Sequence, residues 1–179
     1  LLRGNRSTKQ NADGFNAFDS FNYPHLCEAG VKFTFAKHHI LKPDYSKKMI
    51  PHFNMDPNVM VFSLFPGIQA SIFGHVLDAP ELKGFGSGNA PQQPWLMRLL
   101  KDASERGVTI VNISQCGAGF VEMSRYDNGY QLKDTGVISG HDCTVEAAVT
   151  KLMYLHGQYE DTNIVRELMS RSLAGEISI

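Results

Sequence analysis

The chain has 179 residues, of which 42% are hydrophobic and 20% charged, and its formal net charge is -1 at pH 7. This composition is typical of a folded globular protein and excludes a disordered, fibrous or disulfide-built chain. Because 17 basic residues are balanced by 18 acidic ones without a basic stripe, we expect no nucleic-acid partner.

The three cysteines are Cys27, Cys116 and Cys143, with no CxxC pair and no histidine cluster beside them. Reduced thiols in a cytoplasmic protein are the simplest interpretation, and we expect neither a metal nor a cofactor. No stretch approaches the roughly twenty apolar residues of a membrane span, and no signal-peptide pattern is present, so no membrane partner is expected. The first residues resemble the end of a strand that runs into a loop, which suggests that the sequence begins inside a longer domain.

Residues 1–24 are polar and rich in turn-forming residues, with aromatic side chains at close spacing, namely Phe15, Phe18, Phe21 and Tyr23. Such aromatics need a partner surface to cover them. The alternation at residues 31–35 predicts a strand. Residues 37–57 are interpreted as a linker, in which 49–53 is a possible short edge strand.

From residue 58 onward, strand and helix patterns alternate. A nearly continuous apolar run at 59–65 predicts a parallel strand covered on both faces. The further predicted elements are a helix at 72–77, a helix from Pro91 to Gly107, a strand at 108–113, a strand at 136–138, a helix capped by Asp142 and closed by Gly157, and a helix from Asp161 that ends before Gly175. This order predicts an α/β domain at 58–179, with an open, mostly parallel sheet and flanking helices.

Residues 79–90 break this pattern, because they contain no apolar run that could form a buried strand. A right-handed crossover fold requires a strand there. Either the neighbouring helices are joined by a bare loop, or about five residues of strand are absent between Lys83 and Phe85. The second interpretation is favoured.

Two glycine-containing loops are candidate ligand sites. Residues 86–91, Gly-Ser-Gly-Asn-Ala-Pro, lead into a helix whose N–H groups and dipole attract an anion such as a carboxylate or phosphate. Judged alone, this loop is better explained as a turn with Asn89 as N-cap. Residues 114–119 follow a strand and therefore lie at the carboxyl edge of the sheet, where such sheets bind ligands. We interpret Cys116 as a buried, inert thiol, in preference to a nucleophile approached by His141.

Five segments resemble the type I bacterial L-asparaginases, in order and at that family's spacing. They are Arg-Gly-Asn-Arg-Ser-Thr-Lys at 3–9, Ala-Asp-Gly-Phe at 12–15, the loop at 86–91, Asn-Ile-Ser-Gln-Cys at 112–116 and Thr-Val-Glu-Ala at 144–147. The resemblance extends from Leu1 to Gly175. It implies that 1–36 is the end of the family's N-terminal domain, 37–57 its linker and 58–179 its C-terminal domain.

The resemblance implies an amidohydrolase that converts L-asparagine to L-aspartate and ammonia through a threonine acyl-enzyme. The family's Thr-Gly-Gly-Thr and His-Gly-Thr-Asp-Thr motifs and its catalytic lysine have no match here, so no catalytic residue is expected and the chain alone is predicted to be inactive. The family further implies a cytoplasmic homodimer or homotetramer. In its close dimer, Asn89 would orient the α-amino and carboxylate end of the substrate. A second, regulatory asparagine site would involve Thr8 and Cys116.

Two other interpretations remain open. The chain could be a non-catalytic α/β module that binds an amino acid or small anion at residues 86–91. It could also be a structural polypeptide that associates through exposed aromatic side chains of residues 1–36.

Overall fold

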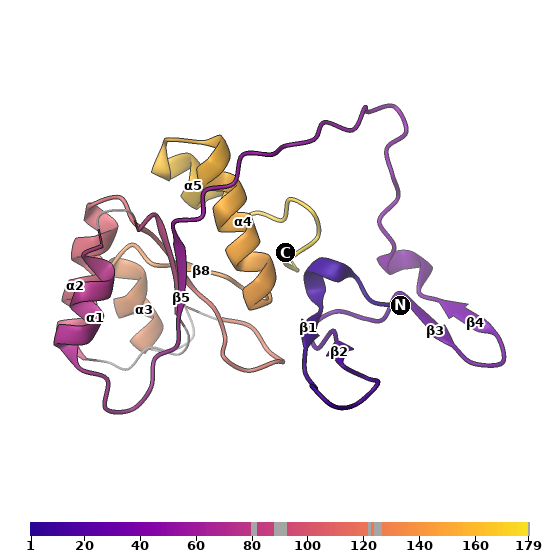
Figure 1. Cartoon of the computed structure of the whole chain (residues 1–179), viewed down its shortest axis with the longest axis horizontal. Helices are drawn as coiled ribbons and strands as arrows, with labels where there is room; N and C mark the ends of the chain where they lie inside the picture. Colours follow the sequence, from indigo (N-terminus) through magenta and orange to yellow (C-terminus); the bar gives the residue numbers. More distant parts are fainter. Residues whose placement is uncertain (80–81, 88–92, 122, 124–126, 179) are drawn as a thin grey trace.

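The computed structural model describes residues 1–79, 82–87, 93–121, 123 and 127–178, and for 85–87 and 127–130 the backbone alone. Figure 1 shows two parts, residues 1–39 and residues 58–178, joined by an extended segment that arches between them. The C-terminal end of the chain returns to lie beside the first part. The division of the chain into domains at 36 and 57 stays a prediction.

The first part consists of short elements: η1 (Gly4–Arg6), β1 (Thr8–Lys9), β2 (Phe18–Asp19), β3 (Cys27–Ala29), β4 (Phe33–Phe35) and η2 (Lys37–His39). β1 pairs with β2 and β3 with β4, both antiparallel. The strand predicted at 31–35 is therefore confirmed in its second half. The other three strands were not predicted, because two or three residues are too few to display an alternating pattern.

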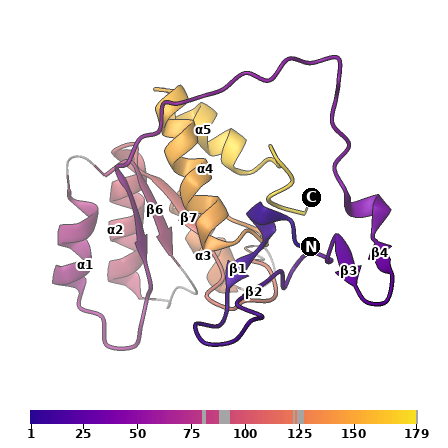
Figure 2. The ribbon, with the colours of Figure 1, turned by 45° about the vertical axis from the view of Figure 1, so that its right-hand side comes forward.

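The second part contains β5 (Val59–Phe62), α1 (Ala70–Leu77), β6 (Gly84–Ser87), α2 (Pro94–Glu105), β7 (Thr109–Asn112), α3 (Asp127–Asp134), β8 (Ile138–Ser139), α4 (Val145–Gln158) and α5 (Thr162–Met169). Its four strands pair in parallel in the order β5-β6-β7-β8. The predicted open, parallel α/β sheet is thus confirmed. Figure 2 shows α1 and α2 on one side of the sheet and α4 and α5 on the other.

Each face of the sheet has its own core. Phe73 of α1 and Leu96 and Leu100 of α2 pack with Ile110 of β7 on one side. The residues on the other side include Val111, Leu152, Leu155, Val165 and Met169. Because side chains alternate along a strand, Ile110 and Val111 enter opposite cores. Each fully buried side chain of this size contributes about 1.5–3 kcal/mol, so β7 is the structural centre of the domain.

The prediction that residues 79–90 contain no strand is wrong. Gly84–Ser87 forms β6, hydrogen-bonded on one side to β5 and on the other to β7. A strand between two partners is held by its backbone ladder, which requires no apolar run. A Cβ atom at Gly84 would lie 3.3 Å from Leu152 of α4, so the glycine lets this helix pack closely on the strand. A bare loop between the helices is excluded, and in the described residues β6 pairs directly with both β5 and β7.

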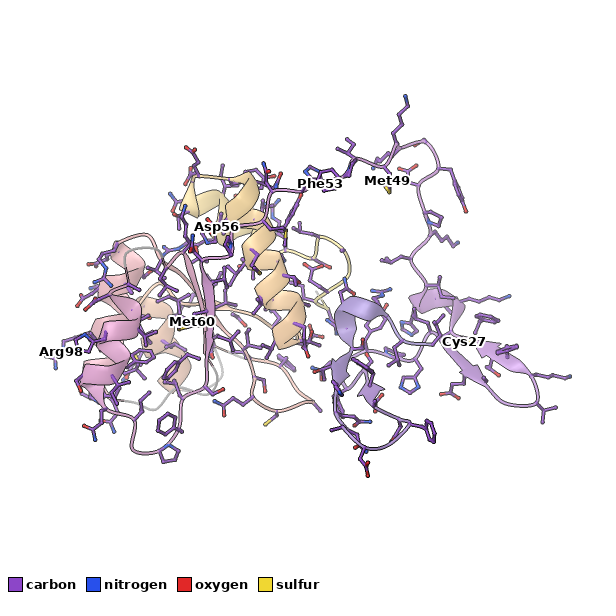
Figure 3. The ribbon with its side chains drawn as sticks, in the orientation of Figure 1. Cys27, Met49, Phe53, Asp56, Met60 and Arg98 are labelled. Carbon is purple, nitrogen blue, oxygen red and sulfur yellow. The ribbon has the colours of Figure 1, made fainter. Side chains whose placement is uncertain are left out.

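Two predictions about β5 and the segment that precedes it are also wrong. β5 is an edge strand, and its Met60 and Val61 are 42% and 47% exposed instead of covered on both faces. Residues 49–53 form no strand. Figure 3 shows Met49 and Phe53 on the extended segment, which reaches α4 near Asp56. There the Asp56 N–H donates to the carbonyl of Met153 at 2.9 Å.

Two helices differ from the predictions: α2 begins later than expected, and α3 was not expected at all. α2 begins at Pro94 instead of Pro91, and Pro94 occupies the first helical position, where no N–H is needed. Gly107 follows the end of α2 at φ 96°, as predicted. α3 was missed, because its first residues, Asp-Asn-Gly, are typical of a loop.

Candidate functional site

The first candidate site is the connection between β6 and α2. β6 ends at Ser87 and α2 begins at Pro94, so this connection lies at the carboxyl edge of the sheet. The side chain of Gln93, the N-cap of α2, makes no capping hydrogen bond, and the first turn of the helix carries no acidic residue. The positive end of a twelve-residue helix therefore lies beside this connection, in a position to attract an anion. Asn89 itself lies outside the described residues.

Asn112 lies at the same edge, as the last residue of β7. It is paired with Ser87 on β6 and with Ser139 on β8. Its side chain is 7% exposed, and within the described part of the chain its Oδ1 has no hydrogen-bond partner. A buried acceptor without a donor is uncommon, and water or a ligand usually supplies one. The carboxyl edge thus contains an acceptor that could serve a bound molecule.

The loop after β7 is fixed to the N-terminal part. The Asn22 side chain donates to the carbonyl of Gly119 at 2.8 Å and accepts from the Gly119 N–H at 2.8 Å. A Cβ atom at Gly117 would lie 3.0 Å from the ring of Phe21, so the two segments are closely packed. Cys116 in this loop is exposed, which corrects the prediction of a buried thiol. It is exposed because it lies on the turn beyond the strand.

Thr8 lies on β1, close to the start of α4. Its hydroxyl donates to Oε1 of Glu146 at 2.6 Å. Cys116 forms a different contact, because its N–H donates to the hydroxyl of Ser114. No hydrogen bond joins Thr8 to Cys116 in the described ranges. Their shared role in a regulatory site stays a prediction.

Arg6 and Asp142 form an ion pair that sequence analysis did not predict. Nη1 and Nη2 of Arg6 donate to the two carboxylate oxygens of Asp142 at 3.0 and 2.5 Å. Arg6 is 2% exposed and also donates to the carbonyls of Asn22 and Glu176. The assignment of Asp142 as the cap of α4 is wrong. Thr144 is the N-cap, because its hydroxyl accepts from the Ala147 N–H.

The environment of Asp142 fixes its charge. Burial would raise the pKa of this carboxyl, but hydrogen bonds from the Arg6 guanidinium and from Ser178 outweigh it and lower the pKa to about 2. Asp142 is therefore ionised at neutral pH and already has its partners. The carboxylate of Asp142 is directed to Arg6.

A second buried ion pair joins Lys151 of α4 to Glu176 of the C-terminal tail at 2.7 Å. Both residues are more than nine-tenths buried. Burial would raise the pKa of Glu176, but the Lys151 ammonium and the N–H groups of Leu173 and Ala174 lower it overall. The signal that could have revealed Lys151 is its position between Ala148 and Leu152, on the apolar face of α4.

The cysteines and histidines were candidates for metal ligands. In the described part of the chain, no group of three or more His, Cys, Asp or Glu residues could hold a metal ion. All three cysteines are free, and burial, aided by the Glu176 charge, raises the pKa of Cys143 to about 12. A thiol with this pKa stays protonated and is a poor nucleophile.

Among the residues described, no helix has the length and apolarity needed to cross a membrane.

Comparison with known proteins places these features in a family. The sequence profile of the family described as the Glutaminase/Asparaginase C-terminal domain matches residues 58–169. L-asparaginase 1 of Escherichia coli K12 is 41% identical over 188 residues, which cover 99% of this chain and 54% of the relative. The 60 kDa lysophospholipase of Mus musculus is 39% identical over 185 residues, which cover 100% of this chain and 32% of the relative.

Solved structures have the same fold. The crystal structure of L-asparaginase I from Vibrio cholerae superimposes with a TM-score of 0.91 at 40% identity, covering 99% of this chain and 55% of that one. The thermostable L-asparaginase from Thermococcus kodakarensis superimposes with a TM-score of 0.84 at 30% identity, covering 99% and 54%. The chain spans about half the length of these L-asparaginases.

Proposed function

Because this chain belongs to the glutaminase/asparaginase family, we propose that it supplies the C-terminal portion of an L-asparaginase, which hydrolyses L-asparagine to L-aspartate and ammonia. The observation that supports this proposal best is the agreement of 40% identity with a TM-score of 0.91 over 99% of the chain. The reaction itself requires a nucleophile, which we assign to a separate N-terminal portion.

The threonines of this chain support that assignment. Thr109 and Thr135 are buried. Thr144 and Thr150 are hydrogen-bonded within α4, and Thr8 donates to Glu146. A nucleophilic hydroxyl needs a base in place to take its proton. Among these five, Thr8 alone has a carboxylate partner in the described residues, and none of the seven threonines in the sequence stands in the family's catalytic motifs. We therefore assign no catalytic residue to this chain and expect it to be inactive alone.

Asn89 is the residue that we propose to touch the substrate. In the sequence it stands between Ser87, where β6 ends at the carboxyl edge of the sheet, and Pro94, where α2 begins. A helix N-terminus favours the α-carboxylate of an amino acid, and an asparagine amide can both donate and accept. Asn89 would therefore orient the substrate instead of breaking a bond. The free acceptor of Asn112 at the same edge is compatible with such a ligand.

We further propose a regulatory asparagine site that involves Thr8 and Cys116. Support comes from the exposure of Cys116 and from the contacts through which Asn22 joins the loop that contains Cys116 to the N-terminal part.

Three free cysteines favour a reducing compartment, so we propose a cytoplasmic protein. A homodimer or homotetramer completes the proposal, with the Asn89 loop of one subunit serving the active site of its neighbour.

The test is a chimera in which this chain replaces the matching portion of the Escherichia coli relative. Ammonia release from L-asparagine should be absent for the 179-residue chain and present for the chimera. Asn89→Ala in the chimera should lower kcat/KM by roughly 10- to 100-fold, because substrate orientation is lost. Asn163→Ala, on the exposed side of α5, is the matched control and should have no effect. Asparagine hydrolysis by the purified chain alone would overturn the assignment of the nucleophile to another portion.

A second candidate activity follows from the name of the mouse relative, whose identity to this chain is nearly as high. The same chimera should therefore be assayed with a lysophospholipid. Fatty-acid release without ammonia release would favour that activity.

The remaining alternative is a non-catalytic binding module at 86–91. It predicts that the chain binds phosphate more tightly than asparagine in calorimetry, whereas the asparaginase proposal predicts no phosphate preference.

A further inference from the structure

A cavity of about 520 Å³ lies on the α4 side of the sheet, away from the loops discussed above. Its walls come from η1, α4, α5 and the C-terminal tail, and include Asn5, Thr150, Tyr154, Tyr159, Leu168 and Leu173. Sites for small molecules commonly have volumes of about 300–1,000 Å³ and mainly apolar walls with a few polar groups. The size and the lining of this cavity both fit that description.

The charged residues of the cavity neutralise each other. Lys151 donates to Glu176 at 2.7 Å, to the carbonyl of Met169 at 3.1 Å and to the carbonyl of Arg171. All three protons of the ammonium group are therefore used. Glu176 accepts in turn from the N–H groups of the tail. Since the pair leaves no uncompensated charge, the cavity favours an uncharged occupant.

The polar groups that remain available can bind a hydrogen-bond donor. The hydroxyls of Tyr154 and Tyr159 have no hydrogen-bond partner among the described residues, and the Tyr154 ring is held edge-on against His52. The Asn5 side chain donates to the carbonyl of Ala174 at 2.9 Å, while its Oδ1 is buried without a donor. This oxygen is closed to solvent, so the acceptors available to a ligand are the tyrosine hydroxyls. Leu173 at the cavity rim is 47% exposed, so it can move aside at little packing cost.

We propose that this cavity binds an uncharged small molecule with an aromatic or branched aliphatic body and one N–H or O–H donor. The body packs against the tyrosine rings and the leucines, and the donor binds the hydroxyl oxygen of Tyr154 or Tyr159. The ligand also contacts α4 and the C-terminal tail, two segments that the Lys151–Glu176 pair already joins.

Indole and 1-methylindole are matched probes for this proposal, because they share a ring system and differ in the N–H donor. Calorimetry with the full chain should give one site for indole. The loss of one hydrogen bond should make 1-methylindole about 2- to 10-fold weaker. In the double variant Tyr154→Phe, Tyr159→Phe the two probes should bind equally. Equal affinities for the unaltered chain, or no saturable binding of either probe up to about 5 mM, would overturn the proposal.

The location of the site is tested by filling it. Thr150→Trp places an indole ring in the cavity and should weaken probe binding by at least about tenfold by steric exclusion. Ile72→Trp, at an exposed position of α1, is the matched control and should bind like the unaltered chain. Equal binding by the two variants would refute the location. If circular dichroism shows that Thr150→Trp is unfolded, amide chemical shifts of the unaltered chain replace it, and shifts outside residues 5, 150–159 and 173–176 count against the proposal.

Discussion

Arg6 and Lys151 are cations that the fold buries almost completely, at 2% and 7% exposure. Each has a carboxylate partner and donates to backbone carbonyls of segments far away in sequence. Transfer of a charge from water into the protein costs several kcal/mol, so such a residue is tolerated only with a complete set of partners. The two ion pairs therefore specify which segments meet, namely η1, the start of α4 and the C-terminal tail.

Arg6→Ala should destabilise the chain by about 3–5 kcal/mol, because it leaves Asp142 buried without a counter-charge. The carbonyls of Asn22 and Glu176 would lose a donor in the same substitution. Urea unfolding monitored by circular dichroism measures the change. Lys101→Ala, which removes a surface pair with Glu105, is the control and should cost less than about 0.5 kcal/mol. A similar cost for both variants would contradict the structural role of Arg6.

Stability should fall as the pH drops below about 4. The pKa of Asp142 is about 2 in the folded chain, against an ordinary value of 3.8, so the unfolded chain binds more protons between these values. The stabilisation is complete above the ordinary pKa and is lost as the pH falls toward 2. This contribution of Asp142 to the free energy of unfolding is about 2 kcal/mol. Urea titrations from pH 6 to pH 2 should show a smaller pH dependence for Asp142→Asn, and equal slopes for the two proteins would be evidence against this account.

Among the secondary-structure elements, those with a clear apolar period could be predicted from the sequence. β7 is buried at every position, and α2 packs Leu96, Leu100 and Ala103 into the core as its spacing indicates. β6 escaped prediction because Gly-Phe-Gly-Ser has no such period, and its pairing depends on β5 and β7, which are distant in sequence. The exposure of β5 could not be predicted either. Whether a strand lies at an edge is a property of the whole sheet.

The glycine of β6 provides a prediction at the same scale. A Cβ atom at Gly84 would lie 3.3 Å from Leu152 and 3.4 Å from Val59, so alanine needs only a small shift of flexible side chains. Gly84→Val adds two methyl groups at this contact and should cost about 1–3 kcal/mol through overpacking. Gly4→Val is the control, because nothing lies within 4 Å of a Cβ atom there. Urea unfolding of the three variants should rank Gly84→Val as the least stable, and any other order would mean that α4 and β6 are less closely packed than described.

At the scale of the whole molecule, the candidate site could be predicted only in part. The sequence placed the loop at 114–119 at the carboxyl edge, and the parallel pairing of β7 confirms that position. It did not place the loop at 86–91 there, because β6 was not predicted. The roles of Asn89, Thr8 and Cys116 came from the family resemblance and stay predictions. Neither spacing nor composition indicated the connection between Asn22 and Gly119 or the Arg6–Asp142 pair, because such contacts join residues about a hundred positions apart.

The N-terminal part leaves large apolar side chains uncovered, among them Phe15 and Val31, which are fully exposed, and Phe33, at 72%. Exposed apolar surface that is contiguous tends to drive association, so the chain should elute above its monomer mass of 19.9 kDa in gel filtration at high concentration. Phe33→Ser combined with Phe35→Ser should shift the elution toward the monomer, because both residues belong to the exposed hairpin β3–β4. Ile72→Ser removes one exposed apolar side chain from α1 and should leave the elution unchanged. If the unaltered chain is monomeric at every concentration, this surface does not drive association, and the structural interpretation of the chain is refuted.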